Sequence, residues 1–288
     1  LARGLGHQAA HPGELADILE DLVVFDVATG DARVLTPGDA WYDAPAVSPD
    51  GRAVAAIRTT FGSPGEAIRV SLVLVDVATG KQRTLAADVD RWPEAPTWAT
   101  DGSAVYFTAD DEGHHAVFRV DMADGRVTRL TSEGALGDLC PTPDGTALYA
   151  LCATVGSPPR IVRIDARSAD QVPQALPNGI DERGIVAPGV VERLTTRAAD
   201  GTEIGSWLVR PADVSADRPA PLVVWVHGGP LGSWNGWHWR WNPHLLAARG
   251  YAVLMPDPAL STGYGQAMVQ RGWNDWGGAP YEDVTAAV

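Results

Sequence analysis

The chain has 288 residues, of which 45% are apolar, and a formal net charge of −14 at pH 7. So acidic a chain repels the phosphates of nucleic acids and anionic lipids, and no apolar run approaches the roughly 20 residues that cross a bilayer. We therefore expect neither nucleic acid nor a membrane as a partner. The length favours two domains over one.

The first 177 residues contain a repeat. LVVFDVATGDARVLT at residues 22–36 returns as LVLVDVATGKQRTLA at residues 72–86, and two looser copies follow. The aspartates at the same place in the four copies are Asp26, Asp76, Asp121 and Asp165, which are 50, 45 and 44 residues apart. Alternating residues with Asp-Gly and Thr-Gly turns indicate about four strands per unit, and this period is typical of β-propeller blades. We predict the closing blades of a partial β-propeller over residues 1–177, with an all-β sandwich as the alternative.

Two cysteines, Cys140 and Cys152, flank the turn sequence TPDG in one of these units. They are too few for a metal site, and His114 and His115 have no carboxylate or cysteine at metal-ligand spacing, so we predict no bound metal. We interpret the cysteines as two small buried residues of a reducing compartment, the cytoplasm. A cross-strand disulfide is the alternative.

The pattern changes after a stretch rich in proline and glycine, which we predict to be a linker over residues 178–190. Two strands around an Asp-Gly turn are predicted at 191–196 and 203–209. PLVVWV and YAVLMP are continuously apolar, as expected of strands buried on both faces of a parallel sheet. NPHLLAARG indicates a short helix that ends at Gly250, and GAPYEDVTAAV a helix that begins with a proline. We therefore predict an α/β domain over residues 191–288.

The sequence HGGP, residues 227–230, follows the PLVVWV strand at its carboxyl end, where ligands bind in α/β sheets. Gly228 and Gly229 let the backbone turn sharply with its amide groups exposed and no side chain in the way of a substrate. Such amides can donate hydrogen bonds to the oxygen that becomes negative in a tetrahedral intermediate. We predict an oxyanion loop, because lipases and esterases use the same sequence for this purpose. A simple turn is the alternative.

Residues 191–288 resemble the catalytic domain of the prolyl oligopeptidase family of serine peptidases, especially its acylaminoacyl-peptidase and dipeptidyl-peptidase-like branch. The matching segments are VVWVHGGP, LLAARGYAVLMPDP, STGYGQAM and DWGGAPYEDVTAAV, in the order and at the spacing of the family. The resemblance implies a β-propeller followed by the N-terminal part of an α/β-hydrolase domain, and no metal or organic cofactor. It also implies that Gly229 donates its backbone amide to the oxyanion.

Two departures from the family pattern concern the site. Where the family commonly has Asn-Pro-Arg-Gly-Ser before Thr-Gly-Tyr-Gly, residues 257–261 read DPALS, so a loop arginine and a glycine are absent. No G-x-S-x-G occurs, and the nearest approach, GSWNG at residues 232–236, has its serine one place early. In this fold the nucleophile, acid and base follow the last predicted helix. We therefore expect all three beyond Val288, and the chain to be an inactive internal piece of a longer enzyme.

His227 resembles a loop-ordering residue of the motif, because the general base of the family lies far downstream. WNGWHWRW, residues 234–241, carries four tryptophans at spacings of two and three, which cannot all face one core. One interpretation is packing of this loop against the repeat domain. The other is a wall of the peptide cavity, and for this we single out Trp237 and Trp239 as substrate-binding residues, since flat aromatic faces hold apolar side chains.

The resemblance implies a serine-type peptidase that hydrolyses short peptides through an acyl-enzyme intermediate, with the propeller restricting access to small substrates. A carboxylesterase of the α/β-hydrolase fold is one alternative, since the oxyanion chemistry is the same. A propeller binding protein without catalytic activity is the other. Neither the peptide specificity nor the oligomeric state leaves a signal in the sequence.

Overall fold

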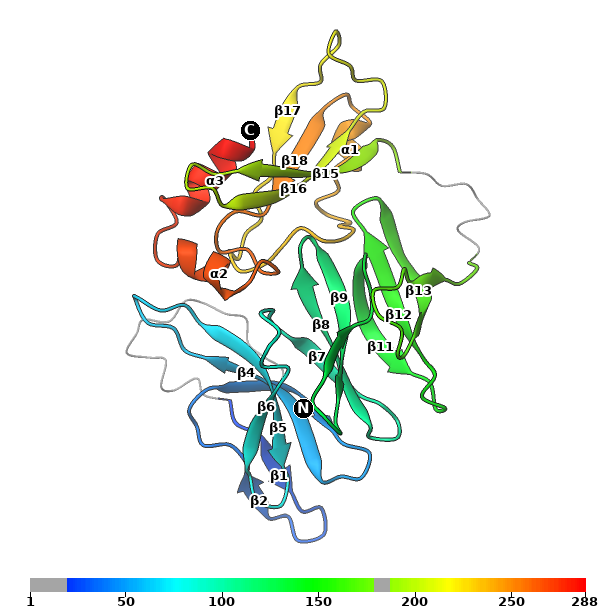
Figure 1. Ribbon diagram of the computed structural model, residues 1–288, viewed down its shortest axis with the longest axis vertical. Coiled ribbons are helices and arrows are strands. Elements are labelled where there is room, and N and C mark those ends of the chain that lie inside the picture. Colours follow the sequence, from blue (N-terminus) through cyan, green and yellow to red (C-terminus); the bar gives the residue numbers. More distant parts are fainter. Residues whose placement is uncertain (1–19, 179–186) are drawn as a thin grey trace.

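The computed structural model describes residues 20–178 and 187–288, which fall into two parts that lie end to end (Figure 1). The first part, residues 20–178, consists of strands and the turns between them. The second part, residues 187–288, combines a small sheet with three helices. No helix within either described range is long and apolar enough to cross a membrane.

The first part begins with two antiparallel sheets. A two-stranded sheet is made of β1 (Val23–Phe25) and β2 (Ala32–Val34). A four-stranded sheet in the order β3-β4-β5-β6 is made of β3 (Trp41–Val47), β4 (Ala53–Thr60), β5 (Arg69–Asp76) and β6 (Gln82–Leu85). The predicted turns connect these strands, and Gly51 and Gly80 have φ of 73° and 70°, which explains why glycine stands at both.

The remaining strands of the first part form one eight-stranded sheet. Its strands are β7 (Glu94–Trp98), β8 (Ala104–Asp111), β9 (His114–Asp121), β10 (Val127–Arg129), β11 (Ala135–Pro141), β12 (Ala147–Thr154), β13 (Ser157–Asp165) and β14 (Gln174–Ala175). They follow the order β14-β13-β12-β11-β9-β8-β7, and β10 also pairs with β9. The link between β9 and β11 is parallel and rests on one residue pair, His115 with Ala135.

This sheet shows that the predicted partial β-propeller is wrong. A propeller needs separate four-stranded blades that close around a channel, and closed rings have about four to eight of them. Here two of the repeated four-strand units are fused into a single sheet through the His115–Ala135 pair, and the described strands close no ring. The repeat therefore identified the antiparallel unit correctly but not its higher-order arrangement.

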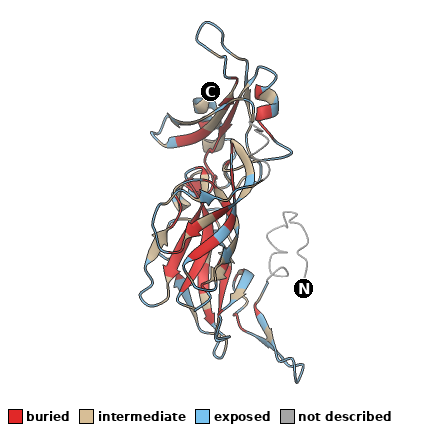
Figure 2. Ribbon diagram, turned by 90° about the vertical axis from the view of Figure 1, so that its right-hand side faces the viewer, coloured by how far each residue is buried: buried red, intermediate tan, exposed pale blue. Residues whose placement is uncertain are grey.

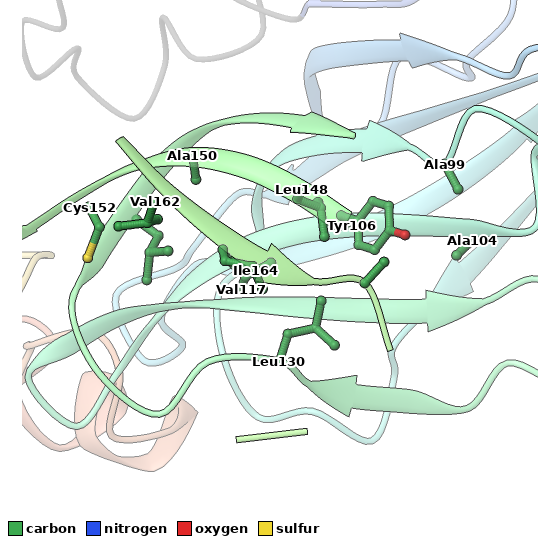
Figure 3. Close-up of a cluster of buried hydrophobic side chains, with 12 residues drawn as sticks. Ala99, Ala104, Tyr106, Val117, Leu130, Leu148, Ala150, Cys152, Val162 and Ile164 are labelled. Atoms are coloured by element: carbon green, nitrogen blue, oxygen red, sulfur yellow. The ribbon is translucent and has the colours of Figure 1, made fainter. Parts of the chain in front are cut away.

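The core of the first part lies in these sheets, where Figure 2 shows most of the buried residues. Figure 3 shows one buried cluster, in which Leu130, Leu148 and Ile164 are fully enclosed. Cys152 belongs to this cluster, and burial raises the pKa of its thiol to about 11. Cys140 is exposed, and both cysteines are free, so the interpretation as two buried thiols holds for Cys152 alone and the disulfide does not form.

The second part contains a four-stranded sheet in the order β15-β16-β18-β17. Its strands are β15 (Val190–Arg197), β16 (Glu203–Arg210), β17 (Leu222–Val224) and β18 (Ala252–Pro256), and its helices are α1 (His244–Ala247), α2 (Gln266–Gly272) and α3 (Ala279–Ala287). Strands β17 and β18 are parallel, whereas the other pairs are antiparallel. Of the YAVLMP segment, Ala252–Pro256 form the strand, which is buried as predicted from Val253 on, whereas Tyr251 precedes it and is exposed.

The PLVVWV segment differs from its prediction. Only Leu222–Val224 forms a strand, and β17 is the edge strand of the sheet, so its outer side has no partner within the described residues. Leu222 is 44% exposed as a result. The predicted division into residues 1–177, 178–190 and 191–288 stays a prediction, because residues 1–19 and 179–186 lie outside the described residues.

Candidate functional site

The HGGP loop leaves the carboxyl end of β17, where the last backbone hydrogen bond to β18 runs from Trp225 N to Leu254 O at 2.8 Å. Gly228 and Gly229 are both exposed. A Cβ added to Gly228 would meet no atom within 4 Å, so its surroundings are open. Gly229 has φ of 127°, and a Cβ there would lie 3.2 Å from Leu231 N. Glycine is therefore required at Gly229 by the backbone itself.

His227 is fixed by a neighbouring serine. Its Nε2 atom lies 2.9 Å from Oγ of Ser261 and 3.7 Å from Oδ1 of Asp257, while Nδ1 faces Gly228 O at 3.4 Å. In a catalytic triad the hydroxyl and the carboxylate contact opposite nitrogens of the imidazole. Here both lie on the same nitrogen, and Ser261 is completely buried. The three residues therefore do not form a triad, and the geometry suits the loop-ordering role predicted for His227.

Asp257 connects the HGGP loop to its surroundings. The carboxylate is fully buried and accepts hydrogen bonds from Ser233 Oγ at 2.8 Å, Trp234 N at 2.9 Å and Tyr264 OH at 2.7 Å. Burial raises the pKa of Asp257, although the hydrogen bonds from Trp234 and Tyr264 oppose this shift. All three donors require an oxygen acceptor, so the carboxylate fixes the start of the tryptophan-rich loop.

The two tryptophans singled out from the sequence lie together but in different surroundings. The rings of Trp237 and Trp239 meet edge to face at 5.4 Å. Trp237 is half-buried and stacks on His244 at 5.5 Å, whereas Trp239 is 74% exposed. His244 in turn lies 3.0 Å through Nε2 from Val155 O in the first part. This arrangement favours packing as the role of Trp237 and leaves the face of Trp239 accessible.

The tip of the β8–β9 hairpin contacts the loops of the second part. Asp110 is buried there, and its Oδ1 accepts hydrogen bonds from Asn235 Nδ2 at 2.7 Å and from His115 Nδ1 at 2.8 Å. Its Oδ2 accepts a hydrogen bond from Thr262. The backbone N–H of Glu112 donates to Gly263 O at 3.0 Å. The first part therefore supports both loops that flank His227.

Charge stabilises this contact. Burial lowers the pKa of His115, but the hydrogen bond and the charge of Asp110 outweigh burial and raise it above its ordinary value. Burial also works to raise the pKa of Asp110, yet the interactions with His115 hold it below its ordinary value. Glu94 adds a more distant carboxylate, 4.0 Å from His115 Nε2.

Two hollows of the described structure, of about 420 and 410 Å³, are lined by neither of the two glycines and neither of the two tryptophans. The second hollow lies where the two parts meet. Its lining includes His115, Leu136, Leu151, Pro159 and Asn235. The structure therefore brings Trp237 and Trp239 together, but neither of these two hollows joins them with Gly228 and Gly229.

A glycine loop at the end of a parallel strand, with its amides exposed, is the feature of hydrolases that stabilise an oxyanion. Residues 237–288 match the family model described as the prolyl oligopeptidase family. The recognition of this family from the sequence motifs is therefore confirmed.

The curated relatives agree with this match. The chain is 32% identical over 259 residues to the probable dipeptidyl-peptidase 5 of Arthroderma benhamiae, an alignment that covers 83% of this chain and 34% of that protein. It is 31% identical over 258 residues to the dipeptidyl-peptidase 5 of Trichophyton tonsurans, with the same coverage. The chain therefore spans about a third of the length of these relatives.

Solved structures show a similar fold. The acylaminoacyl peptidase of Pyrococcus horikoshii in an orthorhombic crystal form matches with a TM-score of 0.73 and 20% identity, over 93% of this chain and 40% of that one. An acylaminoacyl peptidase in complex with Z-Gly-Gly-Phe-chloromethyl ketone matches with a TM-score of 0.72 and 19% identity, over 94% of this chain and 41% of that one. At these identities the likeness concerns the fold alone.

Sequence reasoning missed the residues that hold the loop in place. Asp257 had one available signal, a carboxylate at the carboxyl end of a fully apolar strand, where buried charge is costly without partners. The contacts of Tyr264 with Arg193 and of Asp110 with Thr262 had none, because they join segments that are distant in the chain. The HGGP residues of the loop itself, by contrast, could be identified from the sequence.

Proposed function

We propose that the chain is part of a serine-type peptidase that hydrolyses short peptides through an acyl-enzyme intermediate. The observation that carries this proposal is the exposed HGGP loop at the carboxyl end of β17. Gly228 is open, Gly229 has a backbone conformation that favours glycine, and His227 is anchored from behind by Ser261. The family match and the names of the relatives support a peptidase.

In this proposal the backbone N–H of Gly229 donates to the substrate carbonyl oxygen as a serine attacks the carbonyl carbon. The hydrogen bond strengthens as negative charge develops on that oxygen, and so it stabilises the transition state more than the bound substrate. The rigid support of the loop by His227 and Asp257 keeps the donor aimed before the reaction begins. Preorganisation of this kind is what makes an oxyanion donor effective.

The nucleophile, acid and base come from outside these 288 residues in this proposal. Among the described residues, the only serine hydroxyl hydrogen-bonded to a histidine ring nitrogen is that of Ser261, which substrate cannot reach. The chain alone is therefore expected to be catalytically inactive. The free thiols of Cys140 and Cys152 support a reducing, cytoplasmic location.

Substrate contact is proposed for the aromatic loop. The exposed ring of Trp239 offers a flat apolar face, on which the side chain of a short peptide would pack. Trp237 holds this face in place through its edge-to-face contact. The division of the chain into residues 1–177, 178–190 and 191–288 is also part of the proposal, with the substrate approaching where the two parts meet.

A fluorophosphonate probe tests the proposal, because it labels an activated serine covalently. We expect stoichiometric labelling of the full-length protein that contains this sequence, and none of the 288-residue chain. The full-length protein should also hydrolyse the amide bond of aminoacyl-nitroanilides. Hydrolysis of short p-nitrophenyl esters without any hydrolysis of the nitroanilides would identify a carboxylesterase instead, and an unlabelled full-length protein would show that the protein is not a serine hydrolase.

A further inference from the structure

Arg193 of β15 lies where the two parts of the molecule touch. Its Nη2 donates to Glu112 O at the hairpin tip, 3.2 Å away, and also to the hydroxyl of Tyr264. The guanidinium packs over the ring of Trp207 at 5.1 Å from the ring centre. One cation therefore contacts the first part, the sheet of the second part and the loop that carries Tyr264.

Two glycines make room for this guanidinium. A Cβ added to Gly113 would lie 2.6 Å from Cζ of Arg193, and one added to Gly205 would lie 2.2 Å from its Nη2. Non-bonded carbon and nitrogen atoms do not approach this closely, so any side chain at either position would displace the guanidinium. The space for Arg193 is therefore built into both parts of the molecule.

The hydrogen bonds that follow have one possible direction. A guanidinium only donates, so the Tyr264 oxygen accepts from Arg193 and its single O–H is free to donate elsewhere. That O–H donates to Oδ2 of Asp257 at 2.7 Å. The other carboxylate oxygen accepts the backbone N–H of Trp234 at 2.9 Å. A directed chain thus runs from the hairpin tip to the backbone that follows the HGGP loop.

We propose that Tyr264 and Arg193 are positioning residues for the oxyanion loop, through which the β8–β9 hairpin tip holds Asp257 against the backbone at Trp234. This inference rests on the proposed function for its catalytic consequence. Neither residue touches the substrate. Loss of the Tyr264 hydroxyl leaves the buried carboxylate of Asp257 with one donor fewer, and loss of Arg193 leaves that hydroxyl without the donor that orients it. In either case the loop samples orientations in which the Gly229 amide is not aimed at the substrate.

Tyr264→Phe in the full-length protein is the main test, because it removes one oxygen and leaves the ring in place. Amide hydrogen exchange of residues 227–236 should become at least about tenfold faster, since a buried hydrogen bond to a charged group is lost. The kcat value on an aminoacyl-nitroanilide should fall about tenfold with KM within about twofold of the parent. Tyr281→Phe, at an exposed tyrosine of α3, is the matched control and should change neither quantity.

Arg193→Ala provides the second variant. We expect faster exchange both at the hairpin tip, residues 110–113, and in residues 227–236. Faster exchange at the tip alone would show that Tyr264 transmits nothing and would overturn the role of Arg193. Unchanged exchange in residues 227–236 of Tyr264→Phe, together with kcat within about twofold of the parent, would overturn the proposal as a whole. If the parent hydrolyses no substrate, the proposed function fails, and the exchange measurements still decide the positioning roles.

Discussion

Nε2 of His227 and Oγ of Ser261 are joined by a hydrogen bond of 2.9 Å, and Ser261 is fully buried beneath the HGGP loop. The pair looks like a catalytic dyad by distance alone. The carboxylate of Asp257 lies on the same ring nitrogen, 3.7 Å away, so it cannot orient the imidazole from the opposite side. The pair therefore supports the loop and does not attack a substrate.

Ser261→Ala should accordingly leave the chemistry in place. In the full-length protein we expect unchanged stoichiometry of fluorophosphonate labelling, and a loss of about 1 kcal/mol in the free energy of unfolding from the missing hydrogen bond. Labelling and urea denaturation of parent and variant measure the two quantities. A variant that no longer takes up the probe would identify Ser261 as the nucleophile after all.

Gly229→Val should damage the oxyanion donor that we propose at this position. Valine is strained at φ of 127°, and its Cβ would lie 3.2 Å from Leu231 N, so the amide would turn away from the substrate. The kcat value of the full-length protein should fall on the order of 10²–10³-fold, with a much smaller change in KM. Gly277→Ala is the control, because a Cβ there meets no atom within 4 Å. If a folded Gly229→Val protein kept the parental kcat, HGGP would be only a turn and would not contribute to catalysis.

Substitution of Trp237 and substitution of Trp239 should have different effects on stability and on KM. Trp237→Ala removes the ring that stacks on His244 and should lower the free energy of unfolding by about 2 kcal/mol, less than for a fully buried ring. Trp239→Ala should change that free energy by less than about 0.5 kcal/mol, because its ring is 74% exposed. We expect Trp239→Ala to raise KM for peptides with bulky apolar residues selectively. Equal KM changes for small and bulky peptides would argue against a substrate contact.

The His115–Asp110 pair should make the junction between the parts depend on pH. The pKa of His115 is raised above 6.5, so its contribution to stability is complete below 6.5 and is lost as the pH rises through the folded value. The pKa of Asp110 is lowered from 3.8, so its contribution is lost as the pH falls below 3.8. Between pH 3.8 and 6.5 both contributions to stability are therefore complete.

His115→Gln should therefore lower Tm most between pH 3.8 and 6.5, and less at higher pH. Glu94, the other charged group that faces His115, reinforces the same trend. Melting curves of the parent and the variant across this range provide the measurement. A difference in Tm that does not vary with pH would mean that His115 acts by packing and not by charge.

Arg271, which is partly exposed, pairs with the buried Asp283, and this pair should stabilise the second part. Asp283 is fully buried and binds both Arg271 and Ala259 N, the latter at 2.8 Å. Arg271→Ala leaves this carboxylate without its cation and should cost about 3–5 kcal/mol in urea denaturation. Arg197→Ala breaks an exposed pair with Glu203 and should cost less than about 1 kcal/mol. Equal costs for the two variants would contradict the argument from burial.

Local features of the fold could be predicted from the sequence. The DVATG repeats mark hairpins because glycine at Gly80 supplies the positive φ that the turn needs. The fusion of two units into one sheet could not be predicted, since it depends on a single parallel pair, His115 with Ala135, which leaves no periodic mark. The exposure of Leu222 was also unpredictable, because an apolar run does not reveal whether both neighbouring strands are present.

In the candidate site, too, local features could be predicted from the sequence and long-range contacts could not. HGGP lies at a strand end, as its sequence predicts, because a glycine pair after an apolar run is a local signal. The support beneath it joins Arg193 to Tyr264, 71 residues along the chain, and Asp110 to Asn235, 125 residues along. Contacts at such separations depend on tertiary packing, so they cannot be predicted from the residue types alone.

The hairpin tip between β8 and β9 has a consequence for assembly. It offers the second part the N–H and C=O of Glu112 and the C=O of Gly113, which are matched by Gly263, Arg193 and Trp207. Two fragments of a split protein need such complementary hydrogen-bonding groups in order to associate specifically. Two polypeptides separated within residues 178–190 should therefore recombine when mixed, and a complementation assay built on this tip would report correct docking without any substrate.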